Sequence, residues 1–253
     1  VDRRHRAQHE AIAAATAAIP LEWRRGVVER ADLDRFLFAP DDVILVVGQD
    51  GLVANVAKYL DGQPVLGVDP EPGRNVGILV RHRADRVAKL LKRAVAADNP
   101  DGLTMVELTS DDGQSLTALN EIYIGHARHQ TARYTVSHGD GRPERQASSG
   151  VLIGTGTGCT GWCRSAWQER HSTLTLPDPR ERQLVWFVRE AWPSPTTGTS
   201  LTEGRLLRDQ RLTLVTESDT LVAFGDGIES DAIQLRWGQA MSVGVSPKRL
   251  RLL

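Results

Sequence analysis

The hydrophobic pattern before Gly102 alternates between short apolar runs and helical periodicity. Residues 43–47 form an apolar run with strong β preference, typical of a parallel-sheet strand buried on both faces. Residues 52–60 repeat apolar positions at helical spacing, and residues 64–68 form a second apolar run. Strands that alternate with helices predict a parallel α/β sheet. The other elements predicted here are a helix at 2–19, a strand at 22–29, a short helix at 31–38 and an amphipathic helix at 83–97.

After Gly102 the pattern changes to short strands separated by turn residues. This predicts a mostly β half, a sandwich or related layered sheet, with one helix at 160–170. The predicted strands are 104–109, 118–124, 132–137, 150–155, 174–176, 184–188, 211–216, 221–224, 232–237 and 242–246.

The change of pattern divides the chain into two predicted domains. We expect an α/β domain at 1–103, which carries the turn after the 43–47 strand, a β-rich domain at 104–246, and a tail at 247–253. A doubly wound domain normally opens with a strand, whereas this chain opens with a helix. Either the fold is trimmed, or residues upstream of Val1 are missing from this sequence.

Composition narrows the possible partners. The chain has 253 residues and a formal net charge of −1, so no global field points to nucleic acid or to an anionic membrane. No apolar run approaches the roughly 18–20 residues that span a bilayer. Cys159 and Cys163 are too close together to staple a fold of this size, which favours a reduced, cytoplasmic setting.

The turn Gly48-Gln49-Asp50-Gly51 joins the 43–47 strand to the following helix. A strand that turns sharply into a helix presents backbone N–H groups and the positive helix end at the carboxyl edge of the strand, which suits phosphate. Asp50 is the carboxylate in this turn. It has two interpretations, a functional acid–base group or a simple cap of the helix.

Asn120 and Glu121 interrupt the predicted apolar strand 118–124. Adjacent strand residues point to opposite faces, so one of the two faces inward and needs polar partners. The alternative is an edge strand with one wet face.

Residues Gly156 to Gly161 match G-x-G-x-x-G, the dinucleotide fingerprint. No βαβ unit surrounds them, and Asp178, near the position of a ribose carboxylate, sits in a Pro-Asp-Pro turn, which disfavours a dehydrogenase. Trp162 stands where a P-loop needs lysine, and no G-x-S-x-G elbow is present. A nucleophilic role for Cys159 would need a paired histidine, which a sequence cannot show.

Four segments together resemble the NAD kinase family, in the family's order and spacing over most of the chain. They are Gly48-Gln49-Asp50-Gly51, Pro64-Val65-Leu66-Gly67-Val68-Asp69, Leu119-Asn120-Glu121 and the glycine-rich stretch from Gly154 to Trp162. The likeness is closest to the mitochondrial branch of this family. As in that branch, Ser148-Ser149-Gly150 stands here in place of an acidic residue before glycine.

This resemblance implies a Rossmann-like α/β domain, a β-rich domain, a dinucleotide bound between them and a C-terminal tail that returns to the first domain. It also implies phosphoryl transfer from ATP, with Mg²⁺, to the 2′-hydroxyl of the adenosine ribose of NAD. The expected partners are therefore NAD and ATP, with no nucleic acid and no membrane, in a homodimer or larger assembly.

The resemblance assigns roles to single residues of this sequence. Asp50 would accept the hydroxyl proton, and Asn120 and Glu121 would position the riboses. Thr155, Thr157 and Trp162 would line the adenine end. The remaining expected binding residues are Gly48, Gln49, Gly51, Asp69, Ser149, Gly158 and Thr160, with Arg74 or Arg81 as a helping cation and no residue assigned as a metal ligand.

Several positions depart from the family pattern. Gln49 replaces a glycine and crowds the turn with a Cβ, Leu52 replaces a threonine hydroxyl, and Asp69 replaces an asparagine. Cys159 replaces a serine. These departures leave two alternatives open: a catalytically silent dinucleotide sensor on the same scaffold, and a lipid or diacylglycerol-type kinase that shares the glycine-rich turn with Asp50.

Overall fold

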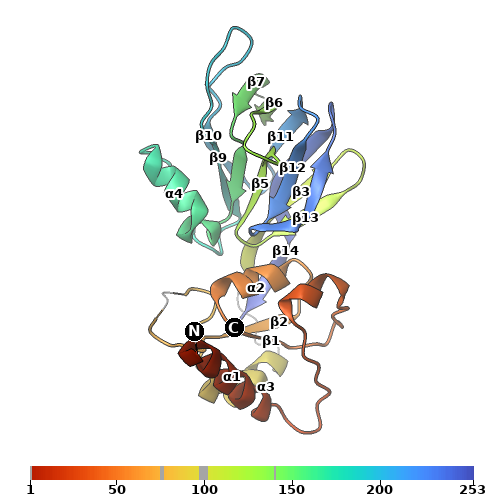
Figure 1. Ribbon diagram of the computed structural model, residues 1–253, viewed down its shortest axis with the longest axis vertical. Coiled ribbons are helices and arrows are strands. Elements are labelled where there is room, and N and C mark those ends of the chain that lie inside the picture. The colour runs from red at the N-terminus through yellow and green to blue at the C-terminus, as the bar shows by residue number, and fades with distance from the viewer. Residues whose placement is uncertain (1, 75–76, 97–101, 140) are drawn as a thin grey trace. The chain divides into compact units, whose positions relative to one another are not determined.

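The computed structural model describes residues 2–74, 77–96, 102–139 and 141–253, and the chain divides into two compact units (Figure 1). The first unit contains Val1–Gly102 together with Arg249–Leu253, and the second contains Leu103–Lys248. No helix in the described ranges is long and apolar enough to cross a membrane.

The first unit is built on three parallel strands. β1 (Ile44–Val47) pairs with β2 (Pro64–Val68), and the last residues of β14 (Ala240–Leu252) pair with the other edge of β2. Figure 1 shows α1 (Asp2–Ala17) and α3 (Val87–Val95) together on one side of these strands and α2 (Asp50–Ala57) on the other. Two short 3-10 helices, η1 (Arg30–Arg35) and η2 (Ala84–Arg86), complete the unit.

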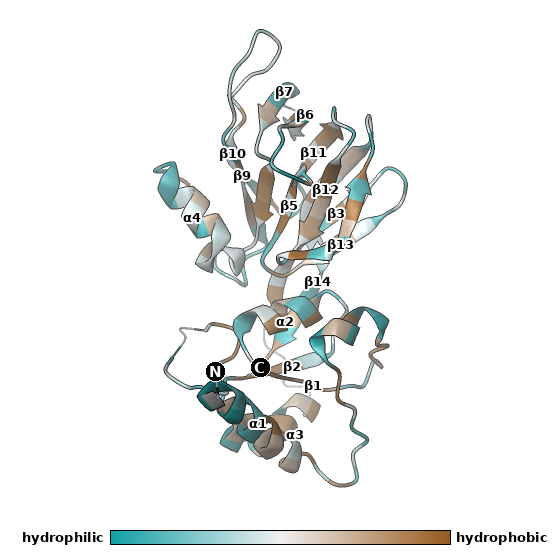
Figure 2. Cartoon of the chain, viewed as in Figure 1, coloured by the Kyte–Doolittle hydropathy of each residue, from teal (hydrophilic) through white to brown (hydrophobic). Residues whose placement is uncertain are grey.

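The core of the first unit explains this arrangement. All five residues of β2 are buried, and Leu66 and Val68 pack against Ala15 of α1 and Leu90 and Leu91 of α3. The N-terminal half of α1 is largely exposed and polar, as its teal colour in Figure 2 shows. Burial of the apolar side chains between these helices and β2 holds the helices on the sheet.

The second unit consists of two antiparallel sheets. One has the order β10-β9-β8-β5-β12-β13, and the other contains β14, β11, β6 and β7, with β3 pairing both β14 and β4. The strands are β3 (Leu103–Ser110), β4 (Ser115–Ala118), β5 (Glu121–His126), β6 (Ala132–His138), β7 (Glu144–Ser148), β8 (Val151–Gly154), β9 (Gln183–Val188), β10 (Glu203–Leu207), β11 (Arg211–Thr216), β12 (Leu221–Gly225) and β13 (Ile228–Leu235). After β8 come the 3-10 turn η3 (Gly158–Thr160) and α4 (Trp162–Glu169).

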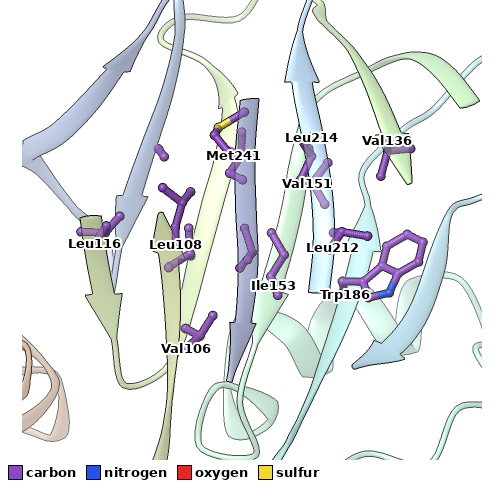
Figure 3. Packing of buried hydrophobic residues seen from close by; sticks show 14 of the residues in the cluster. Val106, Leu108, Leu116, Val136, Val151, Ile153, Trp186, Leu212, Leu214 and Met241 are labelled. Carbon is purple, nitrogen blue, oxygen red and sulfur yellow. The ribbon is translucent and has the colours of Figure 1, made fainter. Parts of the chain in front are cut away.

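The two sheets share one apolar core. Figure 3 shows Leu212 and Leu214 of one sheet beside Val151, Ile153 and Trp186 of the other. Alternate residues of each strand enter this core, as the burial of β11 illustrates, which is the pattern of a β-sandwich. The predicted fold class, an α/β part followed by a β-rich part, is therefore confirmed.

Some predicted elements are wrong. Residues 22–29 form no strand: they are irregular and largely exposed, and Val27 is 85% exposed. Residues 174–176 also lie outside any strand. The predicted strand 118–124 is two strands, β4 and β5, separated by a bend at Leu119 and Asn120. β4, β7 and β10 were not predicted because polar residues and glycine dilute their apolar pattern.

The prediction that residues 43–47 are buried on both faces of the sheet is wrong. β2, not β1, is the strand that is buried throughout. In β1 only Val46 is fully buried, because in the described part of the chain this strand has one neighbour and lies at the sheet edge. The helix after it begins at Asp50, two residues before the predicted start at Leu52.

Candidate functional site

The turn after β1 is fixed by backbone hydrogen bonds. Gly48 N–H donates to Val68 O of β2 at 3.1 Å, and Leu52 N–H donates to Gln49 O at 2.9 Å. Gln49 precedes the first residue of α2 in extended conformation and makes no side-chain capping bond. The first N–H groups of α2 and its positive dipole end therefore lie at the carboxyl end of β1, which is where an anion is favoured.

Asp50 does not cap α2. Its Oδ2 accepts a hydrogen bond from Ile78 N–H at 2.7 Å, and its Oδ1 accepts from Leu79 N–H at 3.1 Å and from Val80 N–H at 2.9 Å. The carboxylate thus holds a segment 28–30 residues further along the chain. The interpretation of Asp50 as a simple helix cap is wrong, since its oxygens are turned toward this segment.

The other predicted polar groups of the first unit are engaged locally. Asp69 Oδ1 accepts from Glu71 N–H at 2.8 Å, so its carboxylate closes a turn after β2. Arg74 pairs with Glu71 at 2.9 Å, and Arg81 Nε donates to Ile78 O. Each arginine uses one guanidinium N–H in these contacts, and its other N–H groups could still meet phosphate.

In the second unit, a bend places Asn120 and Glu121 at the end of β4 and the start of β5. Asp226 holds this bend: its Oδ2 accepts from Leu119 N–H at 2.9 Å and its Oδ1 from Asn120 N–H at 2.6 Å. Asp226 N–H returns a bond to Glu121 O at 3.0 Å. Because Asn120 is outside the strand, its side chain is not constrained to the face opposite Glu121.

The glycine-rich turn after β8 packs directly on this bend. Thr155 Oγ1 donates to Leu119 O at 2.6 Å, and Thr155 N–H donates to Asn120 O at 2.9 Å. The same hydroxyl accepts from the N–H groups of Thr157 and Gly158. Thr155 is fully buried, so it shapes this turn from within the protein.

Gly158 is needed for close packing in this turn, whereas Thr157 keeps a hydroxyl that could bind a ligand. A Cβ on Gly158 would lie 2.3 Å from Asn120 O, so this contact requires glycine. Thr157 Oγ1 is buried and makes no hydrogen bond within the described ranges. A buried hydroxyl of this kind normally meets a partner, such as a ligand or a water molecule. Thr160 is exposed, and its hydroxyl donates back to Thr157 O at 2.8 Å.

Glu121 is buried beside two thiols. Burial is the main cause that raises its pKa to about 8, and the negative charge of Asp226 adds to the effect. Burial, followed by the charge of Glu121, raises the pKa of Cys159 to about 12 and that of Cys163 well above its usual range. A nucleophilic role for Cys159 is therefore disfavoured, since the thiolate is the nucleophile.

The raised pKa of Glu121 predicts a pH-dependent stability. Between its ordinary pKa of 4.5 and about 8, the unfolded chain has lost the Glu121 proton while the folded chain retains it. Stability therefore falls as the pH rises through this window. A tenfold difference in proton affinity between the folded and unfolded chains is worth about 1.4 kcal/mol, so Glu121→Gln should recover on the order of 2–4 kcal/mol at high pH.

The measurement is urea unfolding of the wild type and Glu121→Gln across that pH range. The difference in unfolding free energy between the two proteins should grow in favour of the variant as the pH rises. The difference isolates Glu121, because all other titrating groups are common to both proteins. A difference that stays constant with pH would contradict the buried, protonated state.

Aromatic side chains stand beside the glycine-rich turn. The rings of Tyr123 and Trp162 stack with centroids 5.6 Å apart, and Arg189 lies over Trp162 at 5.3 Å. Tyr123 also contacts Phe224 and donates its hydroxyl to Ser149 O at 2.8 Å. Such stacks offer flat apolar surface next to a cation, which suits a base and its phosphates.

Some of the site residues predicted from the sequence are in direct contact in the structure. In the second unit, Asn120, Glu121, Thr155 and Gly158 form one cluster, and Ser149 and Trp162 are linked through Tyr123. Gly48, Gln49, Asp50, Gly51 and Asp69 lie in the first unit. Sequence reasoning assigned no site role to Asp226 or to the backbone N–H groups of residues 78–80.

Comparison with known proteins finds likeness in sequence to two proteins and likeness in fold to a solved structure. The chain is 26% identical to the NAD kinase of Chlorobaculum tepidum over 141 residues, 54% of this chain and 47% of that protein. It is 25% identical to the NAD kinase of Caldicellulosiruptor saccharolyticus over 213 residues, 83% of this chain and 75% of that protein. The match thus spans about half of the first relative's length. No protein-family model matches the chain.

Among solved structures, yeast NADH kinase in complex with NADH superposes with a TM-score of 0.61 at 18% identity. The alignment covers 83% of this chain and 60% of that one, and at this identity it establishes the shared fold. The likeness to the mitochondrial branch stays a prediction. The chain is therefore similar in sequence to two NAD kinases, and it shares the fold of an NADH kinase.

Proposed function

We propose that this chain is an NAD kinase, which transfers the terminal phosphoryl group of ATP to the 2′-hydroxyl of the adenosine ribose of NAD. The observation that carries the proposal is the cluster in the second unit. There the Asn120–Glu121 bend and the turn from Thr155 to Gly158 are held together by Asp226 and by the Thr155 hydroxyl. Packing alone does not require so many buried polar groups in one place, whereas recognition of a dinucleotide does.

The chemistry requires mainly positioning and charge neutralisation. Phosphoryl transfer passes through a loose transition state, so the protein aligns donor and acceptor and stabilises spread negative charge. We assign the N–H groups of Gln49 to Gly51, at the start of α2, to phosphate oxygens, because the Gly48 N–H is bonded to Val68 O. Asp50 would orient the attacking hydroxyl and accept its proton.

In the dinucleotide site, Asn120 and Glu121 would bind the riboses. The unpaired hydroxyl of Thr157 and the ring of Trp162 would contact the adenine end, while Thr155 and Gly158 shape the turn. Glu121 in its protonated form would act as a hydrogen-bond donor below about pH 8, which a carboxylate cannot do. Ser149 and Thr160 remain peripheral binding candidates.

Mg²⁺ would enter with ATP and neutralise phosphate charge. The described ranges contain no group of three or more histidine, cysteine or acidic side chains that could hold a metal. Mg²⁺ would be carried mainly by the phosphates, with Asp69 as the candidate carboxylate in the first unit. We also propose a cytoplasmic homodimer or larger assembly. The free state of both cysteines supports the cytoplasmic location.

The test is NADP formation by the purified chain from NAD and Mg-ATP, read with an NADP-specific dehydrogenase. Steady production of NADP is expected. Calorimetric binding of NAD without turnover of ATP or polyphosphate would instead identify a dinucleotide sensor. Absence of NAD binding, with ATP turnover on a diacylglycerol substrate, would identify a lipid-type kinase.

A further inference from the structure

The segment from Gly77 to His82 is fastened to the end of β2. His82 N–H donates to Gly67 O at 3.1 Å, and Asp69 N–H donates to His82 O at 2.8 Å, which makes a parallel bridge. His82 Nε2 also lies 2.7 Å from Leu253 O at the chain's end. The later half of this segment is therefore fixed by the sheet.

The earlier half is fixed by the side chain of Asp50. Its carboxylate accepts the N–H groups of Ile78, Leu79 and Val80. Hydrogen bonds to an ionised acceptor are roughly twice as strong as neutral ones. A carboxylate has about four lone-pair sites, so about one site, on Oδ2, is left for a further donor.

Gly77 leaves the space that this arrangement needs. A Cβ at this position would lie 2.6 Å from Asp50 Oδ1, 3.3 Å from Asp50 Cγ and 3.2 Å from Val80 Cγ2. A side chain here would therefore press most closely on the Asp50 carboxylate, and less closely on the side chain of Val80.

We propose that Gly77 is a positioning residue, which lets the segment 78–80 hold the Asp50 carboxylate so that the remaining Oδ2 site meets the substrate hydroxyl. This inference rests on the proposed function and refines it. The carboxylate then has two simultaneous tasks, to fasten the segment and to orient the acceptor. Displacement of the carboxylate impairs both tasks while its charge is retained.

The test compares Gly77→Ala with Gly26→Ala. Gly26 lies in the same unit, has no positive φ, and a Cβ there would meet no atom within 4 Å. For Gly77→Ala we expect kcat for NADP formation to fall about 10-fold or more, since misplacement by about 1 Å can cost about 100-fold. KM for NAD should stay within about 2-fold, because dinucleotide binding is assigned mainly to the second unit. Gly26→Ala should match the wild type in both.

Amide hydrogen exchange supplies a readout that does not depend on turnover. The N–H groups of residues 78–80 should exchange faster in Gly77→Ala than in the wild type and in Gly26→Ala. Loss of this protection with an unchanged kcat would overturn the positioning role and leave the kinase standing. Unchanged protection would overturn the contact itself. If the wild type formed no NADP, the proposed function would fail, and the exchange result would still decide whether Gly77 holds the carboxylate.

Discussion

Asp50→Asn is expected to lose at least about two orders of magnitude in kcat for NADP formation. The substitution removes the negative charge that orients and accepts the substrate hydroxyl. It also puts an NH₂ donor where a carboxylate oxygen now accepts backbone N–H groups of Ile78, Leu79 and Val80. At least one of these N–H groups then loses its acceptor.

The lost hydrogen bond affects stability as well as activity. A buried N–H without an acceptor costs about 1–3 kcal/mol, so Asp50→Asn should also destabilise the first unit. The loss of rate must therefore be corrected for the folded fraction, measured by urea unfolding under assay conditions. Gly77→Ala, which keeps the carboxylate but shifts it, separates orientation from charge. An Asp50→Asn protein that retained most of its kcat would refute the assignment of Asp50.

Gly158→Ala is the second substitution with a large expected effect. A Cβ there would lie 2.3 Å from Asn120 O and 2.8 Å from Asn120 C, which are backbone atoms held by Asp226 and Thr155. Neither side of the contact can yield without breaking these bonds. Overpacking of this kind costs about 1–3 kcal/mol.

The same displacement should weaken dinucleotide binding. Because the bend that carries Asn120 and Glu121 must move, we expect the Kd for NAD, measured by calorimetry, to rise about 10-fold or more. That rise corresponds to about 1.4 kcal/mol. Gly26→Ala serves again as the control for a glycine substitution without steric consequence. A folded Gly158→Ala protein with wild-type affinity would remove this bend from the binding site.

The sequence predicted the elements whose burial leaves a strong apolar pattern. β2 and α3 follow from the runs at 64–68 and 83–97, and the β-rich second half follows from its regular turns. The strand predicted at 22–29 is wrong, because its apolar residues are exposed or only partly buried, and Val27 is 85% exposed. Here the residue pattern was strand-like, but no neighbouring strand pairs with it in the described part of the chain.

The site residues were found through motifs, but their contacts were not. Asp50 is bonded by backbone N–H groups about thirty residues away, and every residue type except proline carries such a group, so no side-chain pattern marks them. Asp226 lies 106 residues from Asn120, and no local pattern marks it as the acceptor of the Asn120 N–H. Such long-range polar contacts depend on the finished fold.

Gln49 and Asp69, which depart from the family pattern, both lie where the structure tolerates them. Gln49 precedes α2 with an exposed side chain, and Asp69 closes a local turn through Glu71 N–H. Neither residue interferes with the hydrogen bonds of Asp50. We therefore expect these departures to tune substrate binding rather than abolish the reaction.

The most direct test of the central claim compares NAD with its 2′-deoxyadenosine analogue as phosphoryl acceptors for Mg-ATP. The products are identified by phosphorus NMR, and binding of both dinucleotides is measured by calorimetry. The account predicts a 2′-phosphate on NAD, binding of both dinucleotides and no phosphorylated product from the analogue. Phosphorylation of the analogue at another hydroxyl, or binding of NAD without any transfer from ATP, would contradict it.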